Sequence, residues 1–183
     1  TQMKLQFLTL LTAGLLMSSY AMADNYAGIG LGASWNGGHA YTNGIKYDLE
    51  TFSPLWSLFA GTVIPTEWTD VRVEGELLRM DVKPDFGRTR QLRAIMANAT
   101  AVIPNTGWVV EPYAGFGFGY ARWDHNNSIA GQILGGVEYN FEQWPVGTAL
   151  EYRHLWINEK GGKTFSKSKL NSDTLMFKVK YFF

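Results

Sequence analysis

The sequence predicts an all-β fold, an eight-stranded antiparallel transmembrane up-and-down β-barrel, on three observations. Segments of about ten residues alternate apolar and polar side chains and are separated by turn residues. The chain combines 20 glycines with 7 tryptophans, 9 tyrosines and 11 phenylalanines, an unusual mixture for a soluble core. Its tryptophans fall near the ends of the segments, as in the aromatic girdles of membrane barrels.

Composition narrows the function classes. The 183 residues suffice for one domain, and 16 basic side chains balance 16 acidic ones, so the charge excess typical of disorder or nucleic-acid binding is missing. Without cysteine, disulfide scaffolds, thiol catalysis and cysteine-based zinc sites are excluded. His39, His125 and His154 lie far apart without ligand spacing, so we predict no metal and no cofactor.

The first segment has the three parts of a secretory signal. Lys4 precedes an uncharged apolar stretch, and Ala21 and Ala23 form a small-x-small cleavage site. We therefore predict a signal peptide at residues 1–23, the first two of which are extra upstream residues, and the barrel at residues 24–183. The alternative is a membrane anchor, because the stretch carries no charge.

Eight alternating segments follow the cleavage site, and each fits one strand. In order, they span residues 26–35, 52–64, 69–80, 92–103, 108–120, 129–141, 146–156 and 174–183. The second is the least regular. In the first, third and fourth, the apolar face holds Ala27, Ile29, Leu31, Ala33 and Trp35; Val71, Val73, Gly75 and Leu77; and Ile95, Ala97, Ala99, Ala101 and Ile103.

The last four segments repeat this division. Their apolar faces hold Ala114, Phe116, Phe118 and Tyr120; Ile133, Val137, Tyr139 and Phe141; Leu150, Tyr152 and Trp156; and Leu175, Phe177, Val179, Tyr181 and Phe183. A soluble sandwich also alternates, but here the apolar face is rich in aromatic rings and the opposite face is rich in glycine. Glycine suits a narrow lumen, and lipid requires a closed sheet. The apolar face is therefore predicted to contact lipid.

The opposite face predicts a polar lumen filled by charged side chains. Its charge network is predicted to consist of Arg72, Glu74, Glu76, Glu111, Glu138, Glu151, Arg153, Lys178 and Lys180. Charges in so narrow a space must pair, because isolated buried charges are unfavourable. Two interpretations stay open: a polar plug that fixes strand register, favoured because small barrels are filled by their own side chains, and a narrow gated ion channel.

Aromatic girdles and cationic loops are predicted at the two ends. If residue 24 starts in the periplasm, the outer girdle consists of Trp35, Trp56, Trp123 and Trp156, and the inner one of Trp68, Trp108, Trp144, Tyr139 and Tyr181. Longer outer connections are expected at residues 36–51, 81–91 and 157–172. Cationic residues cluster in or near the last two of these connections: Arg88, Arg90, Arg93, Lys160, Lys163, Lys167 and Lys169. These can contact lipopolysaccharide phosphates, host glycans or acidic proteins, or remain merely solvated.

The chain resembles the eight-stranded outer-membrane barrels typified by the OmpA membrane domain, OmpX and the opacity-type surface proteins. The matching segments are EPYAGFGFGY at residues 111–120, GGVEY at residues 135–139 and EYR at residues 151–153. The ending, with Tyr181 and Phe183, resembles the signal read by the barrel-assembly machinery. This resemblance implies a bacterial outer-membrane protein, surrounded by lipid and lipopolysaccharide, with surface loops that can meet a host ligand. We expect a monomer without nucleic-acid partners.

Two enzyme interpretations remain as alternatives. The pairs Glu74/Glu76 and Glu138/Glu151 suit acid–base hydrolysis only if a substrate can reach them. Residues 151–154 also resemble the His-containing strand of lipid A deacylases of the PagL kind. That family places Ser two residues after the His, but Trp156 stands there after His154. We therefore predict a non-enzymatic protein with a structural role in the envelope.

Overall fold

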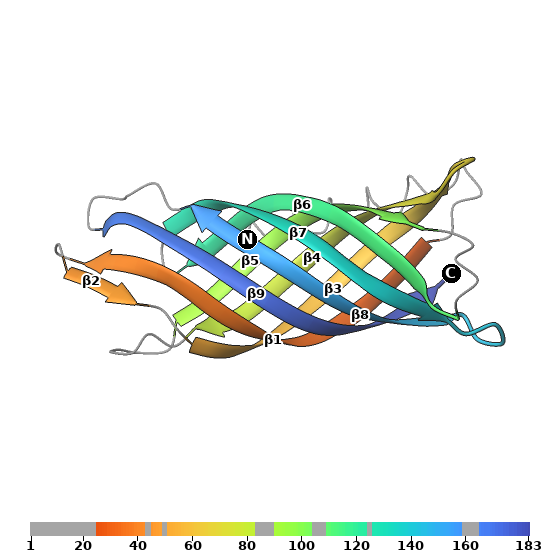
Figure 1. The fold of residues 1–183 in the computed structure, drawn as a ribbon, viewed down its shortest axis with the longest axis horizontal. Helices are drawn as coiled ribbons and strands as arrows, with labels where there is room; N and C mark the ends of the chain where they lie inside the picture. The colour runs from red at the N-terminus through yellow and green to blue at the C-terminus, as the bar shows by residue number, and fades with distance from the viewer. Residues whose placement is uncertain are drawn as a thin grey trace, which may run out of the picture.

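The fold is a closed antiparallel barrel whose strands run obliquely around a common axis (Figure 1). This computed structural model describes residues 25–42, 45–48, 51–82, 90–103, 109–123, 126–158 and 165–183. The predicted signal peptide at residues 1–23 lies outside the described residues. The part of the chain that is described contains no helix long and apolar enough to cross a membrane.

Eight long strands form the barrel and one short strand extends it. The strands are β1 (Asn25–Thr42), β2 (Ile45–Asp48), β3 (Thr51–Pro65), β4 (Asp70–Val82), β5 (Arg90–Val102), β6 (Glu111–Trp123), β7 (Asn126–Asn140), β8 (Val146–Asn158) and β9 (Phe165–Phe182). Neighbours in sequence pair from β3 to β9, and β1 pairs with both β3 and β9. Because the first and last strands pair, the predicted eight-stranded barrel is confirmed.

The strands continue past the ends predicted for them. The connection expected at residues 36–51 contains the end of β1 and the whole of β2, which pair as a hairpin. The connection expected at residues 157–172 likewise contains the start of β9, and Trp156 pairs there with Asn171. Beyond lipid, a strand keeps its backbone hydrogen bonds without needing apolar side chains, so alternation marks the lipid-facing part rather than the strand end. The extension and β2 lie at the end of the barrel opposite the C-terminus (Figure 1). We call these the outer end and the periplasmic end, after the orientation that the sequence predicts.

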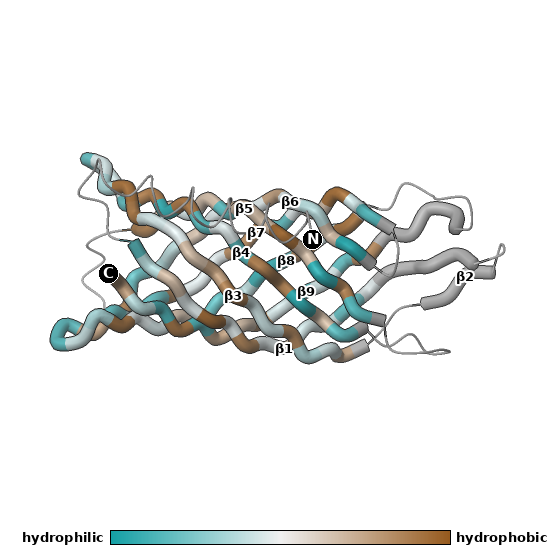
Figure 2. The backbone as a smooth tube through the Cα atoms, turned by 180° about the vertical axis from the view of Figure 1, so that it is seen from behind, coloured by the Kyte–Doolittle hydropathy of each residue, from teal (hydrophilic) through white to brown (hydrophobic). Residues whose placement is uncertain are grey.

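Side chains alternate between the wall and the lumen, as predicted. Phe116, Phe118 and Tyr120 are exposed on the wall, and Phe118 keeps 66% of its surface. The brown, hydrophobic positions recur along the strands in Figure 2. Glycine faces the lumen where side chains cross it: a Cβ on Gly28 would stand 2.5 Å from Cζ of Phe59. These positions therefore need glycine, because the lumen has no room for a larger residue.

Candidate functional site

The centre of the lumen is an ion cluster around Arg153 of β8. Its Nη1 donates to both carboxylate oxygens of Glu76 on β4, at 3.0 and 2.9 Å, and its Nε donates to Glu151 at 3.1 Å. Its Nη2 also donates to Glu151. The Arg153 side chain is 0% exposed, so the lumen supplies every partner of this guanidinium.

Two lysines of β9 and one arginine of β4 extend the cluster toward the periplasmic end. Lys178 Nζ donates to the two oxygens of Glu74 at 3.0 and 3.3 Å. Lys180 donates to Glu138, which also accepts a 2.7 Å hydrogen bond from Arg72 Nη1. One carboxylate therefore bridges two cations contributed by strands far apart in the sequence.

Two amide side chains connect the carboxylates from within. Asn98 Nδ2 donates to Glu74 at 3.3 Å and to Glu76 at 3.0 Å. Gln132 Nε2 donates in turn to Asn98 Oδ1 at 2.7 Å. Neither amide is among the residues predicted for the charge network. The available signal was parity, because Gln132 shares the parity of Glu138 on its strand and Asn98 lies opposite the apolar face of its segment.

Two buried tyrosines were missed by sequence reasoning, although Tyr113 shares the parity of Glu111 on the same strand. The Tyr26 hydroxyl donates to Glu74 at 3.3 Å, and the Tyr113 hydroxyl donates to Glu151 at 2.9 Å. The Lys180 ammonium lies 5.1 and 5.7 Å from the centres of the two rings, within cation–π range. The two tyrosine side chains thus fill part of the lumen and also donate hydrogen bonds to buried carboxylates.

The buried charges balance. In the described part of the chain, four cations and four carboxylates are buried: Arg72, Arg153, Lys178, Lys180, Glu74, Glu76, Glu138 and Glu151. The ninth predicted member, Glu111, keeps 47% of its side chain exposed and stands 4.0 Å from Arg72 Nη2. The structure therefore brings eight predicted residues into one network and places Glu111 at its periplasmic mouth.

The outer part of the lumen holds no buried charge among the described residues, which corrects the expectation of a lumen filled by charged side chains. Buried hydroxyl and amide side chains lie there, among them Ser34, Asn36, Ser53 and Ser172. The same part of the lumen holds one cluster of buried apolar side chains: Leu55, Leu78, Met80, Leu92, Ala94, Met96, Ala121, Ala130, Leu155, Ile157, Leu170 and Met176. We call this group the apolar plug. At the outer ends of β4 and β5 the polarity of the two faces inverts, because Arg79 and Arg93 stand on the wall beside the buried Leu78 and Leu92, so the rule that apolar residues face lipid did not reveal it. The ion cluster lies on the periplasmic side of the plug.

Substrate chemistry at the lumen carboxylates is not supported by this geometry. Glu76 and Glu151 are almost completely buried, and each is held by Arg153. A general acid or base must lie within hydrogen-bond reach of its substrate. Among the described residues, no three His, Cys, Asp or Glu side chains form a group that could hold a metal ion.

A second polar cluster lies on the outside of the wall. His154 Nδ1 and the Tyr152 hydroxyl both bond Asp173 Oδ1, at 2.7 and 2.6 Å. A His–Asp pair of this kind positions an imidazole for base catalysis. The outward neighbours of His154 on its own strand are Tyr152 and Trp156, and its partner on β7 is Ile133. None of these three carries the serine hydroxyl that the deacylase interpretation requires.

The girdle residues lie mostly on the outer surface. Trp35 and Trp56 are exposed toward the outer end, where Trp35 packs edge-on against Phe52 at 5.9 Å between ring centres. Trp156 is half-buried beside His154. The inner-girdle members that are exposed toward the periplasmic end are Trp68, Trp144, Tyr139 and Tyr181. Trp108 and the side chain of Trp123 lie outside the described residues.

The cationic residues assigned to loops occupy different places. Arg93 is a wall residue of β5, and Arg90, Lys167 and Lys169 belong to strands, although only the Arg93 side chain is described. For Arg90, Lys167 and Lys169 the reason is that the strands start earlier than predicted, whereas Arg93 already lies within the predicted segment 92–103. The remaining members, which are Arg88, Lys160 and Lys163, lie outside the described residues.

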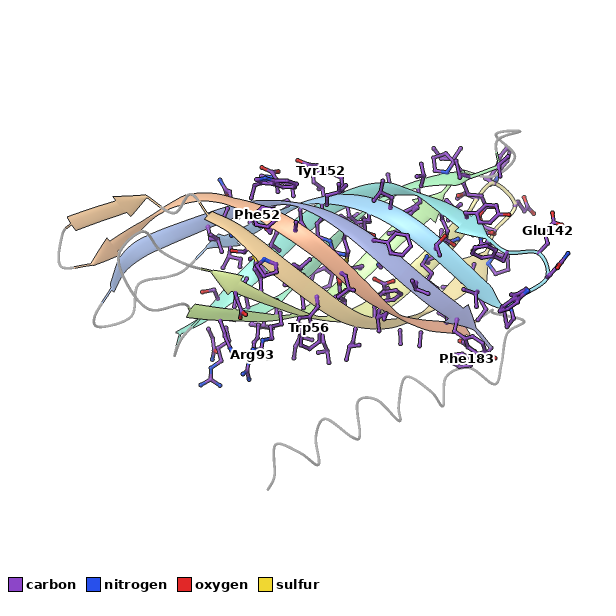
Figure 3. All side chains as sticks on the ribbon, turned by 90° about the horizontal axis from the view of Figure 1, so that it is seen from below. Phe52, Trp56, Arg93, Glu142, Tyr152 and Phe183 are labelled. Carbon is purple, nitrogen blue, oxygen red and sulfur yellow. The ribbon has the colours of Figure 1, made fainter. Side chains whose placement is uncertain are left out.

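The C-terminal end closes the barrel at its periplasmic edge. Tyr181 and Phe183 are exposed, and the Phe183 amide donates to the Asn25 carbonyl at 2.9 Å. Figure 3 shows Phe183 and Glu142 at this end. The two residues predicted as an assembly signal therefore lie beside the seam between the first and last strands.

Comparison with known proteins identifies the family. The model described as outer membrane protein beta-barrel domain matches residues 7–183. The chain belongs to this family. It is therefore an outer-membrane β-barrel protein, and the family resemblance seen in the sequence is confirmed. No curated protein matches the chain by sequence.

Solved structures of the same fold differ widely in sequence from this outer-membrane barrel. Neisserial surface protein A superposes with a TM-score of 0.60 at 21% identity, over 88% of this chain and 99% of that one. The outer membrane protein AlkL, solved in lipid bilayers, gives 0.57 at 11% identity, over 91% and 92%. At these identities the likeness concerns the fold alone.

Proposed function

We propose that the protein is a non-enzymatic, non-conducting barrel that reinforces the outer membrane and presents its outer end for surface contacts. The observation that carries this proposal is the packing of the lumen. Eight balanced buried charges occupy its periplasmic part, and the apolar plug occupies its outer part. An ion crossing the barrel would have to lose its water against the plug and displace paired charges.

Its partners follow from the two ends. Lipid covers the aromatic wall, and the cationic residues at the outer end contact lipopolysaccharide phosphates, with a host or other surface ligand as the alternative. The barrel-assembly machinery recognises the strand that contains Tyr181 before the barrel closes. The mature protein is a monomer that reaches the membrane after export with its signal peptide.

Conductance tests the closed lumen. In planar lipid bilayers, we expect the purified barrel to give no stepwise current, because the plug excludes hydrated ions. A general porin in the same bilayers serves as the positive control. Regular steps that Glu138→Gln abolishes, with strand content unchanged, would instead establish the narrow gated channel.

A lipid-modifying hydrolase is the second candidate, favoured by the His154–Asp173 pair on the wall. We expect no loss of acyl chains from lipid A, because the pair has no serine among its outward neighbours. The measurement is mass spectrometry of lipid A from cells that express the protein or its His154→Ala variant. Acyl loss with the original protein and none with the variant would contradict the non-enzymatic proposal.

A further inference from the structure

Three arginines lie side by side on adjacent strands of the outer wall. Arg79 of β4 pairs in register with Arg93 of β5, and Arg93 pairs with Arg122 of β6. Arg93 and Arg122 are exposed, and Arg79 is half-buried. Directly opposed residues of antiparallel strands have Cβ atoms about 5 Å apart. We call these residues the arginine row; Figure 3 shows Arg93 pointing away from the wall, on the same side as Trp56.

The arginine row marks the edge of the lipid-facing wall. On each strand, the next outward residue toward the periplasm is apolar or aromatic: Leu77, Ile95 and Tyr120, which are themselves in register. The outward positions beyond them are Val71, Val73, Gly75, Ala97, Ala99, Ala101, Ala114, Phe116 and Phe118. The row therefore stands where lipid hydrocarbon gives way to lipid headgroups.

The charges of the row are poorly balanced by the protein itself. Like charges directly opposed across two strands destabilise a sheet. Asp81 Oδ1 is 3.8 Å from Arg79 Nε, beyond hydrogen-bond distance, and Arg93 Nη2 donates to the neutral Gln91 at 3.0 Å. No carboxylate within the described ranges forms an ion pair with Arg93 or Arg122. Among the residues that the structure describes, three cations thus face one carboxylate, an arrangement that an external anion would stabilise.

We propose that the arginine row binds a phosphate of the lipid A headgroup in the outer leaflet. Guanidinium groups bind phosphate oxygens through paired N–H donors, and three in one row can share the phosphate charge. The acyl chains of the same lipid lie against Leu77, Ile95 and Tyr120, which a free phosphate could not use. This inference rests on the proposed lipopolysaccharide contact, but it places that contact on the wall rather than on the loops.

The wall of β8 and β9 differs at this boundary. Its outward residues there are His154 and Asp173, which pair with each other. Among the described side chains of these two strands no arginine or lysine points outward, whereas the arginine row sets three guanidinium groups beside the one carboxylate of Asp81. Of these two described surfaces, β4–β6 is therefore the better match for a phosphorylated lipid.

The test compares two variants that each remove three positive charges. One carries Arg79→Gln, Arg93→Gln and Arg122→Gln, and its matched control carries Lys163→Gln, Lys167→Gln and Lys169→Gln. Binding of bisphosphorylated lipid A to the full barrel in a neutral detergent is measured by native mass spectrometry, with dephosphorylated lipid A alongside. We expect the arginine variant to bind about a hundredfold more weakly, and the lysine variant to bind within about threefold of the original. Inorganic phosphate should not displace the lipid.

Each other outcome is decisive. Unchanged affinity in the arginine variant overturns the inference, and if the lysine variant loses affinity instead, the contact lies at the loops and the proposed function stands. Equal binding of phosphorylated and dephosphorylated lipid A by the original protein overturns the inference and the lipopolysaccharide contact together. If inorganic phosphate displaces lipid A, the arginine row is an anion site that does not recognise the lipid, and the inference is overturned. In phosphatidylcholine vesicles, the arginine variant should unfold no more easily than the original, since like-charge repulsion is removed.

Discussion

Replacing Arg153 with Met lowers the free energy of unfolding of the barrel by about 3–5 kcal/mol. The guanidinium holds Glu76 and Glu151 in a part of the lumen that water does not reach. Methionine fills a similar volume but leaves two buried carboxylates with one cation fewer. Removal of one partner from a buried ion cluster is strongly destabilising for this reason. Urea unfolding in lipid vesicles, followed by tryptophan fluorescence, measures the effect.

A second variant separates charge from packing. Adding Glu76→Gln to Arg153→Met restores equal numbers of buried cations and carboxylates, so we expect it to recover part of the lost stability. The control is Arg122→Gln, which also removes one positive charge but at an exposed position. It should alter the free energy of unfolding by about 0.5 kcal/mol or less. If Arg153→Met alone were no more destabilising than Arg122→Gln, the ion cluster would not support the barrel.

The orientation of the two faces could be predicted from the sequence because lipid is a demanding solvent. It requires a continuous apolar wall, and that requirement appears directly as alternation, as in Phe116, Gly117 and Phe118. Lumen-facing positions alternate with wall positions on the same strands. The charged residues of the lumen could therefore be predicted from their odd or even position in each strand. Barrel closure followed from the same argument, since an open edge in lipid would leave backbone groups unpaired.

The apolar plug could not be predicted in this way. Leu78 and Met80 share the parity of Glu76, but they alternate with the charged residues Arg79 and Asp81, so near the outer end of β4 the apolar residues stand on the lumen face and the charged residues on the wall. The face on which such residues lie has to be inferred from the residues of the same strand that lie nearer its middle. Whether they fill the lumen depends on side chains from other strands, which no single segment contains.

The arginine row was hidden for a different reason. Arg79, Arg93 and Arg122 belong to three separate segments, and alternation fixes only the face on which each points. Sliding one strand by two residues keeps every side chain on its face but separates these arginines. Their adjacency depends on the register of β4, β5 and β6, which the turns and the packed lumen determine together.

Replacing Phe118 with Arg should destabilise the membrane-inserted barrel by about 2–4 kcal/mol. Phe118 faces outward near the middle of β6, four residues from Arg122 at the outer boundary. A guanidinium there must be desolvated by lipid tails, whereas the original ring matches them. Trp144→Arg is the matched control, because Trp144 is 70% exposed in the turn between β7 and β8, and its change should stay within about 0.5 kcal/mol. Unfolding midpoints in vesicles compare the two. If Phe118→Arg destabilised the barrel no more than Trp144→Arg, the aromatic wall would not contact lipid hydrocarbon. Only an apolar solvent makes a cation in the middle of a strand more unfavourable than a cation in a turn.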